Sequence, residues 1–329
     1  MYFTNAFRKV GSRSSGKTST NLSLQAVYQI PTENEPLTNS AHALQRLFYL
    51  LQTSTEAVST AELTRSFGWG AQQIFEPQDL EEFLHKLIEM IEAKMKGTAV
   101  ENALPKLFAG KIKTYISCIN VAYESTRIEN FWSIQLNVSG NKNIDESFRE
   151  YIKVETMDGE YKYYTEGFGF QDAKNGVIFE NFPEVLHLQL KRYEYDPNLD
   201  AMKIVNDRYE FPETFDASSY LSDDADKSEP YIYKLHGVLV YSGDYNSGYN
   251  YAFLKSKKDG PFYKFVDDRV TKCTMKEVLE DNFGGPNPNT RTTPTKMPTL
   301  AYILVYIRES RLEAVLADVT QADIPLHLR

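Results

Sequence analysis

The residues with the clearest chemical pattern lie near the start of the chain, where Gly11, Gly16, Lys17 and Thr18 fit the motif GxxxxGK[ST]. In that motif main-chain N–H groups surround phosphate, the lysine contacts the outer phosphates, and the hydroxyl binds Mg²⁺. The motif requires a buried apolar strand directly before the loop. Residues 5–10 instead include an adjacent Arg and Lys and form no apolar run. We therefore interpret the match as coincidental and expect neither a nucleotide nor any other cofactor.

Thiol chemistry and metal binding have few candidate residues. Cys118 and Cys273 are the two cysteines of the chain and form no CxxC pair. Neither a zinc site nor a disulfide framework is therefore expected. Five histidines are scattered along the sequence, and His187 and His236 fall on expected strands. We expect these two rings to pack or to bond the main chain, and we find no motif for a relocated Cys–His pair.

Composition limits the classes of partner. The chain has 329 residues, with 36 Lys plus Arg against 45 Asp plus Glu, a net charge of −9. An acidic chain releases no counterions from a phosphate backbone, which argues against nucleic acid and favours a basic protein partner. We see neither an apolar signal core nor a run long enough to span a membrane. These features predict a soluble protein of a reducing compartment, the nucleus or the cytoplasm.

Hydrophobic periodicity predicts helices early in the chain and strands later. Apolar residues recur at helical spacing in 43–52 and 80–95. From about residue 112 the pattern changes to strands, with alternation in 186–191. This order predicts an α+β domain. Further strands are expected at 231–241 and 301–307, a short closing helix at 311–320, and loops at 222–230, 242–250 and 284–299.

The chain contains, in this order, the blocks AVYQIPTE, ALQRLFYLLQ, SFGW, KMKGT, PKLFAGKI, VLHLQLKRYEYDP, NDRYEFPE and YILVYIRES. Together these blocks resemble the ubiquitin-specific proteases, and within them the herpesvirus-associated subgroup. The resemblance implies a papain-like cysteine protease fold described as fingers, palm and thumb. It further implies one domain over 1–329, with a helical thumb at about 1–110, strand-rich fingers and palm at about 111–309, and a C-terminal helix at about 310–329.

The family's nucleophile box, GLxNxGxTC, explains the false phosphate-loop motif. Gly11, Gly16 and Thr18 match its two glycines and its threonine. The position of the catalytic cysteine is then Ser19, with Thr18 in the nearest alternative register. Ser14 stands at the asparagine that lies on the oxyanion side. The block AVYQIPTE also follows about ten residues too early, which removes roughly 15 Å of the helix that would hold the nucleophile.

The two other catalytic positions of the family also differ. Tyr249 stands where the family has histidine, and Val266 stands where it has the orienting acid. A tyrosine, with an ordinary pKa of about 10, does not act as a base near neutral pH. Asp267 is one residue along, which in a strand turns its side chain to the opposite face. We therefore expect a catalytically inactive homologue that binds ubiquitin or acts as a scaffold. The alternatives are a weak ubiquitin C-terminal hydrolase using Ser19, and a scaffold that no longer binds ubiquitin.

The resemblance also implies residues that contact the basic C-terminal tail of ubiquitin. Asp79 and Glu82 match acidic positions, Tyr193 and Tyr195 match aromatic groove positions, and Arg192 matches a neighbouring basic one. Each acidic residue has an alternative role in capping the helix at 80–95. The tyrosines have an alternative role in covering a sheet face. The expected partners are ubiquitin or a ubiquitinated protein, and other proteins, with no nucleic acid and no membrane.

Overall fold

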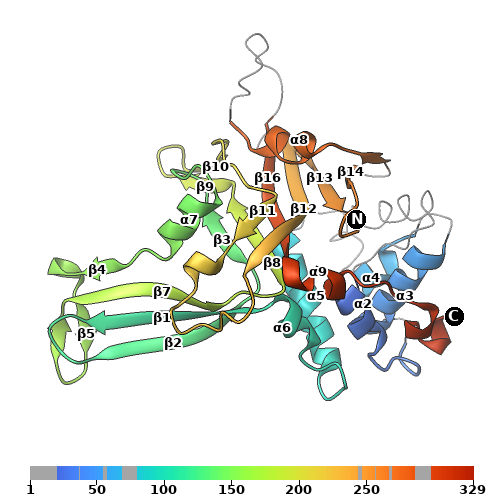
Figure 1. The fold of residues 1–329 in the computed structure, drawn as a ribbon, viewed down its shortest axis with the longest axis horizontal. Helices are drawn as coiled ribbons and strands as arrows, with labels where there is room; N and C mark the ends of the chain where they lie inside the picture. Colours follow the sequence, from blue (N-terminus) through green and yellow to red (C-terminus); the bar gives the residue numbers. More distant parts are fainter. Residues whose placement is uncertain are drawn as a thin grey trace, which may run out of the picture. The chain divides into compact units, whose positions relative to one another are not determined.

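The computed structural model of the chain gathers into two compact units, each made of segments that are distant in sequence (Figure 1). The first unit contains residues 1–107, 250–275 and 311–329, and the second contains 108–249 and 276–310. The structure describes residues 21–36, 38–54, 58–68, 80–243, 247–255, 257–266, 269–285 and 298–329.

Helices dominate the beginning of the first unit. The expected helix at 80–95 is confirmed as α5, which buries Ile88, Ile91 and Met95. These residues recur every three or four positions, so they form one apolar stripe. The helix ends before Gly97, whose φ of +77° a residue with a side chain adopts at a cost. The helices are α2 (Asn21–Tyr28), α3 (Ser40–Thr53), α4 (Ala61–Ser66), α5 (Leu80–Met95) and α6 (Ala103–Phe108).

The middle segment of the first unit, residues 250–275, lies in and around three antiparallel strands. Strand β14 (Phe262–Val266) pairs with β13 (Gly248–Lys255) on one side and with β15 (Arg269–Lys272) on the other. Phe265 is buried at their centre, packed by Leu254, Tyr263 and Val270. Phe265 therefore holds the three strands together through side-chain contact as well as main-chain bonds.

The expected closing helix is shorter than predicted. Only α9 (Leu312–Val315) is α-helical, and two 3-10 turns follow it. The expected helix does not continue because the chain begins a separate 3-10 turn at Thr320. Both the main-chain N–H and the hydroxyl of Thr320 donate to Asp323 Oδ2 at 2.7 Å, which forms a capping box for that turn. Pro325 follows, and it has no N–H with which to continue a helix. The turns are η5 (Gln321–Asp323) and η6 (Leu326–Leu328).

The second unit is built on a central sheet with strand order β12-β16-β8-β3. Its strand β8 confirms the expected alternation, because Leu186, Leu188 and Leu190 are buried. Strand β3 runs parallel to β8, and the other pairs in this order are antiparallel. The strands are β3 (Ile134–Asn137), β8 (Val185–Lys191), β12 (Ile232–Gly243) and β16 (Thr299–Arg308), with β11 (Thr214–Asp216) paired to β12.

A second sheet of this unit has the order β2-β1-β7-β4, and its three long strands run side by side in Figure 1. Strand β1 is its centre, bonded antiparallel to β2 and to β7. A two-stranded hairpin, β5 with β6, lies in the chain between β4 and β7. The strands are β1 (Gly110–Cys118), β2 (Glu124–Phe131), β4 (Glu155–Met157), β5 (Tyr163–Thr165), β6 (Gly169–Gln171) and β7 (Ala173–Asn181).

An aromatic core joins helix α7 (Ile144–Tyr151) to the strands of the second unit. Phe148 is fully buried, stacks on Tyr220 with ring centroids 4.7 Å apart, and contacts Phe179 and Phe215. Asn143 caps the helix through a hydrogen bond from the Glu146 N–H. The many aromatic residues of the composition are thus used to fill this core.

Mixed helices and sheets confirm the expected α+β class. The finer division into thumb, fingers with palm, and C-terminal helix stays a prediction, because strands β13–β15 and the C-terminal segment group with the helices of the first unit. Among the described residues no helix is long and apolar enough to cross a membrane.

Candidate functional site: a tyrosine hairpin anchored by a buried arginine

Arg192 lies where the chain leaves strand β8, and its side chain is only 2% exposed. The guanidinium donates to four main-chain carbonyl oxygens: Ala301 at 3.0 Å, Val205 at 3.4 Å, Asp207 at 2.7 Å and Phe283 at 3.0 Å. Burial lowers its pKa to about 10, which leaves the group charged at neutral pH. We predicted that Arg192 contacts ubiquitin. Its donors are instead directed into the protein, where they join separate segments.

The two strands that follow Arg192 form a hairpin with two different faces. Strand β9 (Tyr193–Asp196) pairs antiparallel with β10 (Ala201–Ile204). Residues directly opposite each other share a face, and side chains alternate along each strand. Tyr193, Tyr195, Met202 and Ile204 therefore form one face, which we call the tyrosine face. Glu194, Asp196 and Lys203 occupy the other, which we call the charged face.

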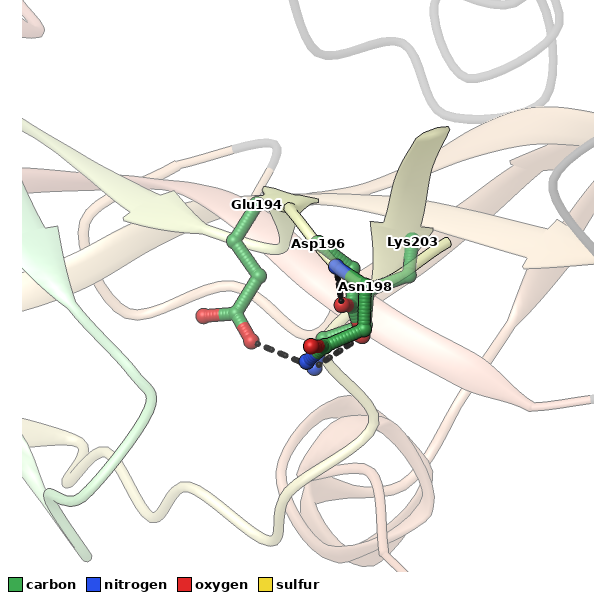
Figure 2. Close-up of polar contacts among 4 residues, drawn as sticks. All are labelled: Glu194, Asp196, Asn198 and Lys203. Atoms are coloured by element: carbon green, nitrogen blue, oxygen red, sulfur yellow. Dashed lines mark hydrogen bonds and ion pairs between the residues drawn. The ribbon is translucent and has the colours of Figure 1, made fainter. Parts of the chain in front are cut away.

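The charged face is linked within itself (Figure 2). Lys203 Nζ lies 3.1 Å from Glu194 Oε1 and 3.3 Å from Asp196 Oδ2, and the Asn198 N–H donates to Asp196 Oδ1 at 2.9 Å. The main-chain bond from Asn198 and the contact with Lys203 lower the pKa of Asp196. Hydrogen bonds to the two carboxylates raise the pKa of Lys203. These bonds tie both strands and the turn of the hairpin together.

The tyrosine face is open to solvent. Tyr193 is 40% exposed and Tyr195 is 55% exposed, and Met202 beside them is also exposed. The Tyr193 ring meets Tyr241 of β12 edge-on, with centroids 6.3 Å apart. The Tyr195 hydroxyl donates to the Asp200 carboxylate, which raises the pKa of Tyr195. An exposed aromatic face whose tyrosines are held in place can bind an extended peptide.

The predicted position of the catalytic histidine lies at the start of β13. Tyr249 is 48% exposed there. Before it, Gly248 fits closely under Tyr241: a Cβ at Gly248 would lie 2.4 Å from the Tyr241 hydroxyl oxygen. Only glycine permits this approach. Tyr241 thus lies against both Gly248, the residue before Tyr249, and Tyr193 of the tyrosine face.

The other predicted site residues are distributed differently. Val266, at the acid position, ends β14 and pairs with Arg269 in the first unit. Glu82 belongs to helix α5, and the position of its side chain lies outside what the structure describes. The remaining predicted positions lie outside the described residues: Ser14, Thr18, Ser19 and Asp79. The structure therefore brings together Arg192, Tyr193 and Tyr195.

The cysteine and the two histidines of the second unit lie in packed surroundings. Cys118 is buried at the end of β1, and His236 is buried on β12. His187 stacks on Phe108 with ring centroids 5.6 Å apart, and burial lowers its pKa to about 4. Over the described part of the chain, no group of three or more His, Cys, Asp or Glu is placed to hold a metal ion.

Comparison with known proteins shows the family to which the chain belongs. The family model described as ubiquitin carboxyl-terminal hydrolase matches residues 1–306. The chain belongs to the ubiquitin carboxyl-terminal hydrolase family. It is 51% identical over 335 residues to ubiquitin carboxyl-terminal hydrolase 15 of Schizosaccharomyces pombe, covering 100% of this chain and 28% of that protein. It is 45% identical over 348 residues to ubiquitin carboxyl-terminal hydrolase 15 of Saccharomyces cerevisiae, covering 99% of this chain and 27% of that protein.

A solved structure shares the fold of this family member. It is the SAGA Ubp8/Sgf11/Sus1/Sgf73 DUB module bound to ubiquitin aldehyde, matched with a TM-score of 0.66 at 22% sequence identity. The match covers 89% of this chain and 68% of that one. The fold is therefore that of the ubiquitin-specific protease catalytic domain, as the resemblance implied. The chain spans less than a third of the length of the two yeast relatives.

The relatives correct one prediction from the sequence. We expected a catalytically inactive homologue, and this is wrong, because proteins 45–51% identical over nearly the entire chain are named ubiquitin carboxyl-terminal hydrolases. The prediction gave a few positions, Ser19, Tyr249 and Val266, more weight than a similarity that extends across the chain. The structure does not describe Ser19, so it shows no replacement of catalytic chemistry there.

Sequence reasoning missed how the hairpin is held. The segment YEYDPNLDAMKI contains the alternation of two faces and a Pro-Asn turn, so the hairpin itself could have been found. The burial of Arg192 could not, because its partners are carbonyl oxygens distant in sequence, and main-chain acceptors leave no pattern of residue types.

Proposed function

We propose that the chain is a hydrolase domain that cleaves the bond following the C-terminal residue of ubiquitin. The observation that carries this proposal is its 45–51% identity, over nearly its entire length, to yeast proteins named for that activity. Because the chain spans less than a third of those proteins, the proposal concerns this domain alone. Within the family we place it nearest the herpesvirus-associated subgroup, on the blocks VLHLQLKRYEYDP and NDRYEFPE.

The hydroxyl of Ser19 occupies the nucleophile position in this proposal. A serine hydroxyl attacks a carbonyl more slowly than a thiolate unless a base removes its proton. We therefore expect measurable but slow release of a fluorophore from a ubiquitin C-terminal amide. Ser19→Ala abolishes that release, and Ser19→Cys accelerates it because a thiol with a pKa near 8.5 is partly ionised at neutral pH.

Thr18→Ala is the matched control, because it removes the hydroxyl in the alternative register and leaves Ser19 in place. Turnover that survives Ser19→Ala but not Thr18→Ala would move the nucleophile by one residue. No turnover by either the wild type or Ser19→Cys, at enzyme concentrations that saturate ubiquitin binding, would overturn the proposed activity.

We further propose that the tyrosine face binds the C-terminal tail of ubiquitin. Its support is the exposure of Tyr193 and Tyr195, together with the Asp200 carboxylate that accepts the hydrogen bond of the Tyr195 hydroxyl and suits a basic peptide. A titration of isotope-labelled monoubiquitin tests this through amide chemical shifts. Replacing both tyrosines by alanine should weaken binding by about tenfold or more, since buried aromatic contacts commonly contribute 1–2 kcal/mol or more.

Leu326→Ala is the control for this titration, because Leu326 is an exposed apolar residue of the first unit. It should leave the affinity for ubiquitin unchanged. Tail resonances that shift equally with the wild type and with the double tyrosine variant would show that the tail binds elsewhere.

A further inference from the structure

Arg192 bonds the chain at the base of the hairpin, both where β9 begins and just after β10 ends. It is the residue directly before β9, and its carbonyl accepts a hydrogen bond from the Val205 N–H at 2.8 Å, just after β10. Its guanidinium then bonds the carbonyls of Val205 and Asp207 on the departing chain. One side chain thus fixes both the entry and the exit of the strands that carry the tyrosine face.

The same guanidinium joins this base to the central sheet. Nε donates to Ala301 O of β16, and Nη2 donates to Phe283 O, which follows η3 (Glu280–Asn282). A buried charge costs several kcal/mol unless hydrogen bonds satisfy it. The main-chain carbonyl oxygens accept hydrogen bonds from the charged guanidinium. The strand and the turn to which these carbonyls belong hold them in place.

Gly284 leaves room for the guanidinium. Its φ is +77°, and a Cβ there would lie 2.8 Å from Leu300 Cδ2, 3.0 Å from Asp207 O and 3.3 Å from Arg192 Nη1. The neighbouring Gly285 N–H donates to Asn206 O at 2.7 Å. The turn at 283–285 is therefore bonded to the chain that leaves the hairpin, and a side chain at Gly284 would press on both Asp207 and Arg192.

The hairpin is tied within itself by the pairing of β9 with β10, by Lys203, which bridges the two strands, and by Asn198, which bonds Asp196 at the start of the turn (Figure 2). A hairpin whose strands and turn are bonded to one another can change its orientation chiefly at its base. We propose that Arg192 is a positioning residue, which sets the orientation of the tyrosine face toward ubiquitin without touching ubiquitin itself. This inference rests on the proposed function of that face.

Arg192→Lys tests the inference, because lysine keeps the charge but its single ammonium cannot reach all these carbonyls. We expect the affinity for monoubiquitin to fall by about tenfold, equivalent to about 1.4 kcal/mol. We also expect faster hydrogen exchange of the amides in β9 and β10. In the hydrolysis assay, KM should rise while kcat changes little, as expected when substrate binding alone is weakened.

Gly284→Ala is the second variant, because it leaves the arginine and the hairpin intact while pushing on Asp207 O and Arg192 Nη1. It should reproduce both the weaker binding and the faster exchange. If Arg192→Lys does not fold, Gly284→Ala decides the outcome alone.

Arg308 provides a matched control in the same unit. It is also a buried arginine, its guanidinium donates to Phe182 O and lies over the Tyr231 ring at 4.0 Å, and none of these groups belongs to the hairpin. Arg308→Lys should lower the melting temperature and leave ubiquitin affinity within about twofold of the wild type.

Equal loss of affinity in the Arg308 and Arg192 variants would mean that lost stability, not hairpin orientation, weakens binding, and would overturn the inference. Wild-type binding with unchanged affinity in Arg192→Lys and Gly284→Ala would overturn it as well. Failure of the wild type itself to bind ubiquitin is a different result, which overturns the proposed function on which the inference rests.

Discussion

At the scale of single residues, His187 shows how burial becomes a dependence of stability on pH. Its ring bonds the main chain of Trp132 and stacks on Phe108, and burial lowers its pKa from 6.5 to about 4. The folded protein therefore binds the proton less readily than the unfolded chain does. The contribution of neutral His187 to stability is therefore complete above the unfolded pKa of 6.5, and it is lost as the pH falls toward 4.

We predict that the free energy of unfolding falls by up to about 1.4 kcal/mol per pH unit between pH 6.5 and pH 4 on account of His187. His187→Gln keeps a side-chain N–H for the main chain but does not titrate, so it should flatten this dependence. Urea unfolding at several pH values measures the effect. The exposed His85 provides the control, and an equally flat profile in His85→Gln would contradict the assignment to His187.

At the scale of elements, the β9–β10 hairpin gathers its linked charged groups on one face. The pKa of Asp196 is lowered, chiefly by the Asn198 N–H and then by Lys203. A lowered pKa means that the stabilisation is present above the ordinary value for aspartate, about 3.9, and is lost as the pH falls through the lower folded value. The hairpin should therefore remain closed at mildly acidic pH.

We predict that Lys203→Met returns the pKa of Asp196 part of the way toward its ordinary value. The remaining difference should come from the Asn198 N–H, which that substitution leaves in place. An NMR titration of the Asp196 carboxyl carbon measures the change. Lys234→Met, which removes an ion pair with Glu309 outside the hairpin, should leave the titration unchanged.

The elements also show which parts of the fold a sequence can specify. Helix α5 and strand β8 were predictable because burial on one side imposes a period that is visible in residue types. The length of the C-terminal helix was not, since it depends on Thr320 and Asp323 forming a cap of their own. The exposed Tyr193 and Tyr195 were placed by resemblance, whereas the buried state of Arg192 depends on carbonyl groups that no side-chain pattern reports.

At the scale of the whole molecule, the first unit depends on contact between distant parts of the chain. Val319 and Ile324, near the end of the chain, form a buried cluster with Tyr28 of α2. A cluster of hydrogen-bonded polar side chains lies in the same unit. The Thr32 hydroxyl donates to Gln45 Oε1, and the Gln45 amide nitrogen donates to Val27 O at 2.8 Å. With its proton so used, the Thr32 oxygen accepts from His327 Nε2 at 3.0 Å, so the Nε2 of that ring carries a proton.

We predict that Ile324→Ala destabilises the first unit by about 2–5 kcal/mol, because it removes buried methyl groups and leaves a cavity against Tyr28. Ile324→Val is the matched variant and should cost only about 0.5–1.5 kcal/mol. Hydrogen exchange measures the result in the amides of α2 and α3, which should lose protection although residue 324 lies almost 300 positions from α2. Unchanged protection in both helices would show that the C-terminal segment does not hold them, and that the first unit draws its stability from residues of the early helices alone.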